Sequence, residues 1–128
     1  MRSDRKRIGQ QSEEAARRVL LAQGYRIREC NFRCAVGELD IIAEHDGRLV
    51  FVEVRSHTGD AFGAPRESVG NRKQRKVARV AEVYIKQRKL QGRPVRFDVV
   101  EVLINQAGRP SSVNVIANAF GAPPDSHI

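Results

Sequence analysis

Residues 37–56, GELDIIAEHDGRLVFVEVRS, decide how this chain folds. The Asp46-Gly47 dipeptide between two apolar runs is typical of a two-residue β-hairpin turn. With that turn, Asp40 lies opposite Glu53, and Glu38 lies opposite Arg55. Directly opposed carboxylates repel each other unless a positive group lies between them.

The two faces of the predicted hairpin differ in polarity, because side chains alternate along a strand. One face is partly charged and the other is wholly apolar. The first carries Glu38, Asp40, Ile42 and Glu44 with Leu49, Phe51, Glu53 and Arg55; the second carries Leu39, Ile41 and Ala43 with Val50, Val52 and Val54.

The opposed carboxylates have two explanations from the residues alone. Asp40 and Glu53 could hold a divalent cation, since Mg²⁺ is usually bound by one or two carboxylates together with water and phosphate oxygens. Alternatively, they lie on a solvent-facing side of the sheet and are compensated by neighbouring arginines (Arg33, Arg48 or Arg55). Apolar residues on the same face favour a covered site, where an unpaired charge is costly.

Composition restricts the class of partner. The chain has 128 residues, a net charge of +8 and an isoelectric point near 10.3, which favours polyanionic partners, nucleic acid first and acidic membrane surfaces second. No apolar run is long enough to cross a bilayer and no signal-peptide core is visible, so we expect a cytoplasmic protein that does not enter the membrane. Cys30 and Cys34 lack a second pair for a structural zinc site and are expected to be free thiols.

Periodicity and turn signals give the order of elements. We expect a mobile basic arm over residues 1–8, one domain over 9–120 and a disordered tail over 121–128. Within the domain we expect a helix over about 10–23, a strand over 25–32, the hairpin, a loop over 57–70, a helix from Asn71, and strands over 95–104 and 113–117.

The second predicted helix is strongly basic near its start, where the helix dipole disfavours positive charge. A solvated face is the common fate of such charge runs. Because stability does not explain cations at a helix start, we predict that they contact nucleic-acid phosphates. The residues are Arg72, Lys73, Arg75, Lys76 and Arg79.

Several motifs together resemble the YraN-type family of small bacterial proteins. They are Glu13, GELDIIA (37–43), VFVEVR (50–55), FGAP (62–65), Lys73, RFDVV (96–100) and ANAF (117–120). That family looks like a minimal PD-(D/E)XK nuclease domain, similar to archaeal Holliday-junction resolvases. The resemblance covers Gly9 to Phe120 and implies a restriction-endonuclease-like, three-layer α/β fold with a mixed central sheet of about five strands flanked by helices.

The resemblance also implies roles for residues. Asp40, Glu53 and the backbone carbonyl of Val54 match metal-ligand positions, and Glu13 matches an acid on the first helix that approaches the metal. Arg55 stands where the family pattern has lysine. Arginine can steady phosphate charge but cannot act as a base, and loss of a general base typically costs ~10²–10⁴-fold in rate.

The function we predict is a Mg²⁺- or Mn²⁺-dependent endonuclease acting on DNA, with branched or structured DNA as a candidate substrate and with Glu13, Asp40, Glu53 and Arg55 as catalytic residues. The alternative is a nucleic-acid-binding protein that keeps the fold but cleaves weakly or not at all, because of Arg55. A third reading is an adaptor whose basic face docks an acidic protein or a membrane surface. Self-association as a homodimer is implied by the resolvase resemblance alone.

Overall fold

The computed structural model describes residues 2–59 and 70–128, and the side chains from residue 5 onward within the first range. It contains two helices and five strands in this part of the chain. They are α1 (Arg2–Ala22), β1 (Arg26–Cys34), β2 (Gly37–His45), β3 (Arg48–Thr58), α2 (Asn71–Arg88), β4 (Val95–Ile104) and β5 (Pro110–Phe120).

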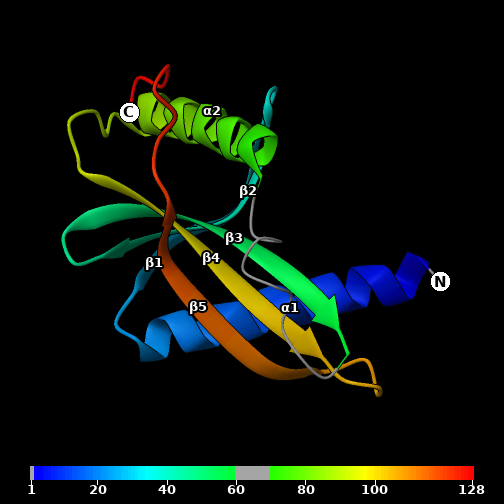
Figure 1. The fold of residues 1–128 in the computed structure, drawn as a ribbon. Coiled ribbons are helices and arrows are strands. Elements are labelled where there is room, and N and C mark those ends of the chain that lie inside the picture. Colours follow the sequence, from blue (N-terminus) through cyan, green and yellow to red (C-terminus); the bar gives the residue numbers. More distant parts are fainter. Residues whose placement is uncertain (1, 60–69) are drawn as a thin grey trace.

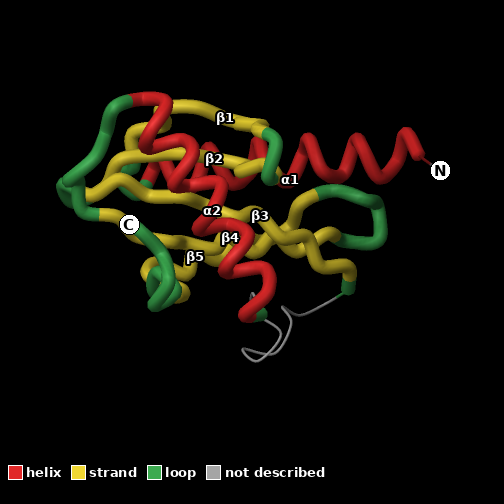
Figure 2. The backbone as a smooth tube through the Cα atoms, turned by 90° about the horizontal axis from the view of Figure 1, so that it is seen from above, coloured by secondary structure: helices red, strands yellow, loops and turns green. Residues whose placement is uncertain are grey.

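The five strands form one mixed sheet in the order β1-β2-β3-β4-β5. Only β3 and β4 are parallel, and α2 lies in the connection between them. The other neighbours are antiparallel. The two helices lie on opposite faces of the sheet (Figure 1), and the view from above shows α2 crossing the strands (Figure 2). This confirms the predicted three-layer α/β fold.

Each helix covers its own apolar core. Under α2, Tyr84 and Val80 pack with Phe51 and Phe97 of the sheet. Under α1, Ala16 and Leu20 pack with a second group of strand residues that includes Val52. Consecutive positions of β3, Phe51 and Val52, therefore enter different cores, as the two-residue period predicts.

The predicted hairpin turn is confirmed. His45 pairs with Arg48, and the two residues between them, Asp46 and Gly47, have φ values of 51° and 73°. Positive φ at both central residues is the geometry of a type I′ turn, which matches the twist of the flanking strands.

The first helix begins earlier than predicted. It starts at Arg2 rather than near Gln10, so residues 2–8 are helical where we expected an arm. Nothing in this segment breaks a helix, because Gly9 is tolerated within one, and Ile8 packs against the α1-side core. The start of α2 at Asn71 is as predicted; its N-cap is Gly70, with no side-chain cap hydrogen bond.

The C-terminal residues pack on α2, although we expected a disordered tail. Ser126 Oγ donates to Glu82 Oε1 at 3.1 Å and the His127 amide donates to the same oxygen at 2.6 Å. Ile128 lies against the α2-side core. Strand β5 is longer than the predicted 113–117, since backbone pairing with β4 continues past its apolar centre.

A buried polar network lies on the α1 side of the sheet. Asp98 is fully buried and accepts two hydrogen bonds from Arg96, at 2.9 and 2.8 Å, and one from the Tyr25 hydroxyl. It also accepts the Asn118 amide at 2.9 Å. Since a buried charge is costly unless it is paired and hydrogen-bonded, this network fixes β4 against β5 and the end of α1.

Two smaller expectations concern cysteines and membranes. Cys30 and Cys34 are both free, as predicted. Neither of the helices described here is long and apolar enough to cross a membrane. The FGAP motif and most of the predicted loop over 57–70 lie outside the described residues, whereas β3 extends to Thr58.

Candidate nuclease-like site

The site forms where β2 and β3 separate. Their pairing runs from His45 with Arg48 to Ile41 with Val52 and ends there. Beyond that point β2 stays paired with β1, while β3 continues beside β4. The Asp40 Oδ2 accepts the Val54 amide at 2.8 Å, so a side chain of β2 replaces the backbone bond and the Asp40 carboxylate lies in the gap between the strands.

The structure corrects three details of the predicted hairpin. Asp40 does not pair with Glu53, because the pairing of β2 with β3 ends at Ile41 and Val52. Glu38 does not lie opposite Arg55; it pairs with Arg33 of β1 and the two side chains form an ion pair at 3.2 Å. Leu39 packs in the α2-side core and not on the face of Ile41. The alternation fails between Leu39 and Ile41, and in β1 it fails between their partners Phe32 and Cys30, which flank Asn31 with its φ of 56°.

Glu53 is the most strongly perturbed acid of the site. Its side chain is 14% exposed, and Lys73 Nζ of α2 lies 3.4 Å from its Oε1. Burial, followed by repulsion from Asp40, raises the pKa of Glu53 to about 7, against the opposing influence of Lys73 and Arg55. Even with two cations nearby, the environment therefore resists a full negative charge at Glu53.

Asp40 is perturbed in the same direction. Burial is the main cause of its raised pKa, and the negative charge of Glu38 adds to it; the Val54 amide and Lys73 act in the opposite direction. Two adjacent carboxylates that both resist ionisation make a region that a further positive charge would stabilise. Such pairs are common at functional sites, although structural ion-pair networks can produce them too.

Glu13 approaches this pair from α1. Burial and then the charge of Asp40 raise the pKa of Glu13, while a hydrogen bond with the Asn31 side chain and the charge of Arg17 lower it. The charges of Glu13 and Asp40 are therefore close enough to influence each other. Within residues 2–59 and 70–128, however, no three His, Cys, Asp or Glu side chains come together closely enough to hold a metal ion.

The residues present suit a hard divalent cation with an incomplete protein shell. The donors of the gap are carboxylate oxygens, with the backbone carbonyl of Val54 as the third predicted donor, and Mg²⁺ and Mn²⁺ favour oxygen ligands. One or two carboxylates are enough for Mg²⁺ when water and phosphate oxygens complete the shell. Asp40 and Glu53 meet that requirement without Glu13.

Sequence reasoning missed the contacts that hold Glu13 in place. Ser12, which precedes it, is buried, and the Ser56 hydroxyl of β3 donates to the Ser12 hydroxyl at 2.7 Å. The sequence signal for this contact was the position of Ser12 between Ile8 and Ala16, in the buried stripe of α1. Asn31, the partner of Glu13, has a φ of 56° within β1, and nothing in its sequence neighbourhood indicates that conformation.

The basic residues of α2 divide between two places. Lys73 contacts Glu53, as described above. The other four line an open hollow of about 860 Å³ on the outer side of the helix start, together with Val36 and Asn71; they are Arg72, Arg75, Lys76 and Arg79. The first turn of α2 contains no acidic residue, so nothing on the helix itself offsets this charge at its positive end.

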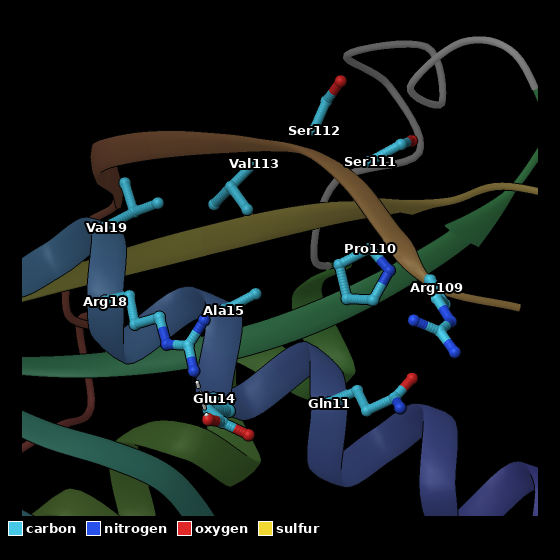
Figure 3. Close-up of a pocket in the computed structure, with 10 residues that line it drawn as sticks. All are labelled: Gln11, Glu14, Ala15, Arg18, Val19, Arg109, Pro110, Ser111, Ser112 and Val113. Atoms are coloured by element: carbon cyan, nitrogen blue, oxygen red, sulfur yellow. Dashed lines mark hydrogen bonds and ion pairs between the residues drawn. The ribbon is translucent and has the colours of Figure 1, made fainter.

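A separate cavity of about 520 Å³ lies between α1 and β5 (Figure 3). Figure 3 shows Arg18 bound to Glu14 on one wall, at 2.7 Å, and Ser111 and Ser112 on the other. Its lining includes none of the predicted site residues. The acids of the candidate site and Lys73 therefore lie elsewhere, at the gap between β2 and β3.

Comparison with known proteins identifies the family of the chain. Residues 12–102 match the model of the uncharacterised protein family UPF0102. The chain belongs to UPF0102. This is the YraN family that the sequence motifs indicated. A UPF0102 protein of Moorella thermoacetica is 45% identical over 120 residues, covering 94% of this chain and 100% of the relative.

Other UPF0102 relatives match over a similar extent. One from Desulfosudis oleivorans is 44% identical over 122 residues, covering 95% of this chain and 96% of the relative. One from Caldicellulosiruptor saccharolyticus is 41% identical over 117 residues, covering 91% and 99%. The UPF0102 match spans Glu13, the gap with Asp40 and Glu53, and the basic start of α2.

Proposed function

We propose that this UPF0102 protein is a divalent-cation-dependent nuclease that cleaves phosphodiester bonds in DNA, with branched or otherwise structured DNA as its preferred substrate. The observation that carries the proposal is the half-buried pair Asp40 and Glu53, held at a break in the sheet with the Lys73 ammonium beside it. A hollow lined by four cations on the same helix as Lys73 supports a polyanionic substrate.

Asp40, Glu53 and the Val54 carbonyl would hold the Mg²⁺ or Mn²⁺ ion. When bound, such an ion lowers the pKa of a coordinated water and offsets charge on the leaving oxygen. Glu13 of α1, whose charge interacts with that of Asp40, would help to orient water. The raised pKa values of Asp40 and Glu53 fit this use, because two carboxylates that repel each other gain from a cation between them.

Lys73 performs the role that the family pattern gives to a lysine at the position that Arg55 occupies in this chain. Its ammonium lies 3.4 Å from Glu53 and favours ionisation of both Glu53 and Asp40. A lysine is a compact donor that can also exchange a proton, which arginine cannot do in proteins. Arg55 favours ionisation of Glu53 as well, and its guanidinium would steady the phosphate.

A second function is favoured by one specific residue. Arg55 in the motif position argues for a nucleic-acid-binding protein in which cleavage is weak or lost, since a missing general base costs ~10²–10⁴-fold in rate. Both functions place the protein on nucleic acid in the cytoplasm, and a homodimer would suit a two-fold symmetric junction. They differ only in whether Lys73 compensates for Arg55.

Cleavage assays on purified protein test the proposal. Junction, duplex and single-stranded DNA are incubated with Mg²⁺ or Mn²⁺, and Asp40→Asn and Glu53→Gln variants are compared with Glu14→Gln, which removes an exposed carboxylate next to Glu13. We expect cleavage by the wild type and by Glu14→Gln only. Cleavage that persists unchanged in both site variants would identify a contaminant and overturn the proposal.

Two further variants separate the proposed functions. Lys73→Gln should abolish cleavage if Lys73 acts as the motif lysine, whereas Lys86→Gln, which removes an exposed lysine from the last turn of α2, should not. If the wild type is inactive and Arg55→Lys restores cleavage, the binding function is correct. Binding to protein or membrane without any binding to nucleic acid would support the adaptor instead.

A further inference from the structure

The first two turns of α1 continue past the sheet towards the N-terminus as part of one helix (Figure 1). Arg5 and Lys6 are exposed there. Because the helix is continuous, the direction of each side chain relative to Glu13 follows from the helical repeat of 3.6 residues per turn. The placement of Glu13 beside Asp40 therefore sets the orientation of the residues before it.

The side of α1 that carries Glu13 also carries Gly9 and Lys6. Residues that are four and seven positions apart lie on one side of a helix, and Gly9 and Lys6 precede Glu13 by those intervals. The stripe next to them, Ile8 and Ser12, faces the sheet. Lys6 and Gly9 thus lie on the side of α1 from which Glu13 approaches Asp40.

Gly9 has no packing reason to be glycine. A methyl group at this position would meet no heavy atom within 4 Å, and the residue is not in the left-handed region of backbone conformation. Glycine within a helix is destabilising relative to alanine. The fold would accept alanine at this position, and glycine is often used where a ligand must approach the backbone closely.

We propose that the side of α1 that carries Lys6, Gly9 and Glu13 is a second contact surface for the phosphate backbone of the nucleic acid. This inference rests on the proposed function. The substrate lies over the gap that holds Asp40 and Glu53 and contacts α1 on one side and the basic start of α2 on the other. Lys6 contacts a phosphate and Gly9 allows the backbone to pass close to the helix. Seven residues of helix separate Lys6 from Glu13 by about 10 Å, or about three nucleotide rises of one DNA strand.

Binding of a fluorescent DNA junction, measured in EDTA over a range of salt concentrations, tests the inference independently of cleavage. Gly9→Ala should bind about tenfold more weakly and yet unfold at the same or a higher temperature, because alanine favours the helix. Lys6→Gln should lower the slope of log affinity against log salt by about 0.9, the value for one lost phosphate contact.

Matched controls lie on other sides of the same helix. Gln11→Ala is compared with Gly9→Ala, and Arg18→Gln, which removes one charge, is compared with Lys6→Gln; Gln11 and Arg18 both line the cavity between α1 and β5. Both controls should bind as the wild type does. If Gly9→Ala and Lys6→Gln also bind as the wild type does, the inference is wrong and the proposed function stands; if the wild type binds no DNA, the proposed function and the inference both fail.

Discussion

Replacement of Glu53 by glutamine is expected to stabilise the folded protein at pH 8 and to have little effect at pH 4.5. Burial and repulsion from Asp40 raise the pKa of Glu53 to about 7 in the folded state, from an ordinary 4.5. The folded protein therefore keeps a proton at Glu53 that the unfolded chain releases. Glutamine removes the penalty of ionising this half-buried group.

The sign and the size follow from proton linkage. Between pH 4.5 and about 7 the folded state binds more protons at Glu53 than the unfolded state does, so the free energy of unfolding decreases as pH rises through this window and is level above it. At ~1.4 kcal/mol per pKa unit, the full loss is about 3 kcal/mol. Lys73, half exposed, loses its partner in the variant at a cost below about 1 kcal/mol.

Urea denaturation in EDTA at pH 4.5, 6 and 8 measures this effect. The free energy of unfolding of the wild type should fall across the series, and that of Glu53→Gln should fall less. The variant should be more stable than the wild type by about 2–3 kcal/mol at pH 8. Glu14→Gln, on the exposed side of α1, should follow the wild type. A Glu53→Gln variant that is less stable at pH 8, or whose pH dependence parallels that of the wild type, would refute the reasoning.

Three other predictions concern the fold and the basic surface. Asp98→Asn should lower the free energy of unfolding by about 3–5 kcal/mol in a denaturant titration, because it leaves the buried guanidinium of Arg96 without its charged partner; a loss below about 1 kcal/mol would contradict the role of that network. Gly37→Ala should cost about 1–3 kcal/mol in the same assay, since Gly37 has a φ of 147° and a methyl group would lie 3.1 Å from Val80 Cγ2; an unchanged midpoint would show that α2 can shift. Arg75→Gln should weaken binding to all DNA sequences and lower the salt slope by about 0.9; a change limited to particular sequences would instead indicate base recognition.

Local signals account for the parts of the fold that the sequence predicts well. The turn at Asp46-Gly47 fixes the register of β2 and β3, because only a type I′ turn fits two residues with positive φ. Strand β4 and the start of α2 also lie where periodicity places them. These features depend on neighbouring residues, so a single sequence contains enough information to predict them.

Features that depend on tertiary contacts were not predictable. Strand β2 separates from β3 at Asp40 while it stays paired with β1, and no residue pattern indicates this separation. The contact between Lys73 and Glu53 joins a helix to a strand that is distant from it in the sequence. The docking of the C-terminal residues depends on Glu82, an acid that looks like an ordinary surface residue in the sequence.

The candidate site was predicted in composition but not in arrangement. Strand pairing and charge balance indicate a carboxylate pair near phosphate, and the family resemblance adds Glu13. The structure brings Asp40 and Glu53 together with Lys73, which sequence analysis placed on a phosphate-binding surface. A helix residue can approach a strand residue in many ways, and only the packing of α2 on the sheet decides which cation reaches the acids.

Calorimetric titration of Mn²⁺ into the purified protein tests the central claim, that Asp40 and Glu53 form a divalent-cation site. We predict one binding site at pH 8, affinity about tenfold weaker at pH 6 because Glu53 must lose its proton, and no binding to an Asp40→Asn, Glu53→Gln double variant. Glu14→Gln should bind as the wild type does. Absence of binding to the wild type at pH 8, or undiminished binding to the double variant, would contradict the account.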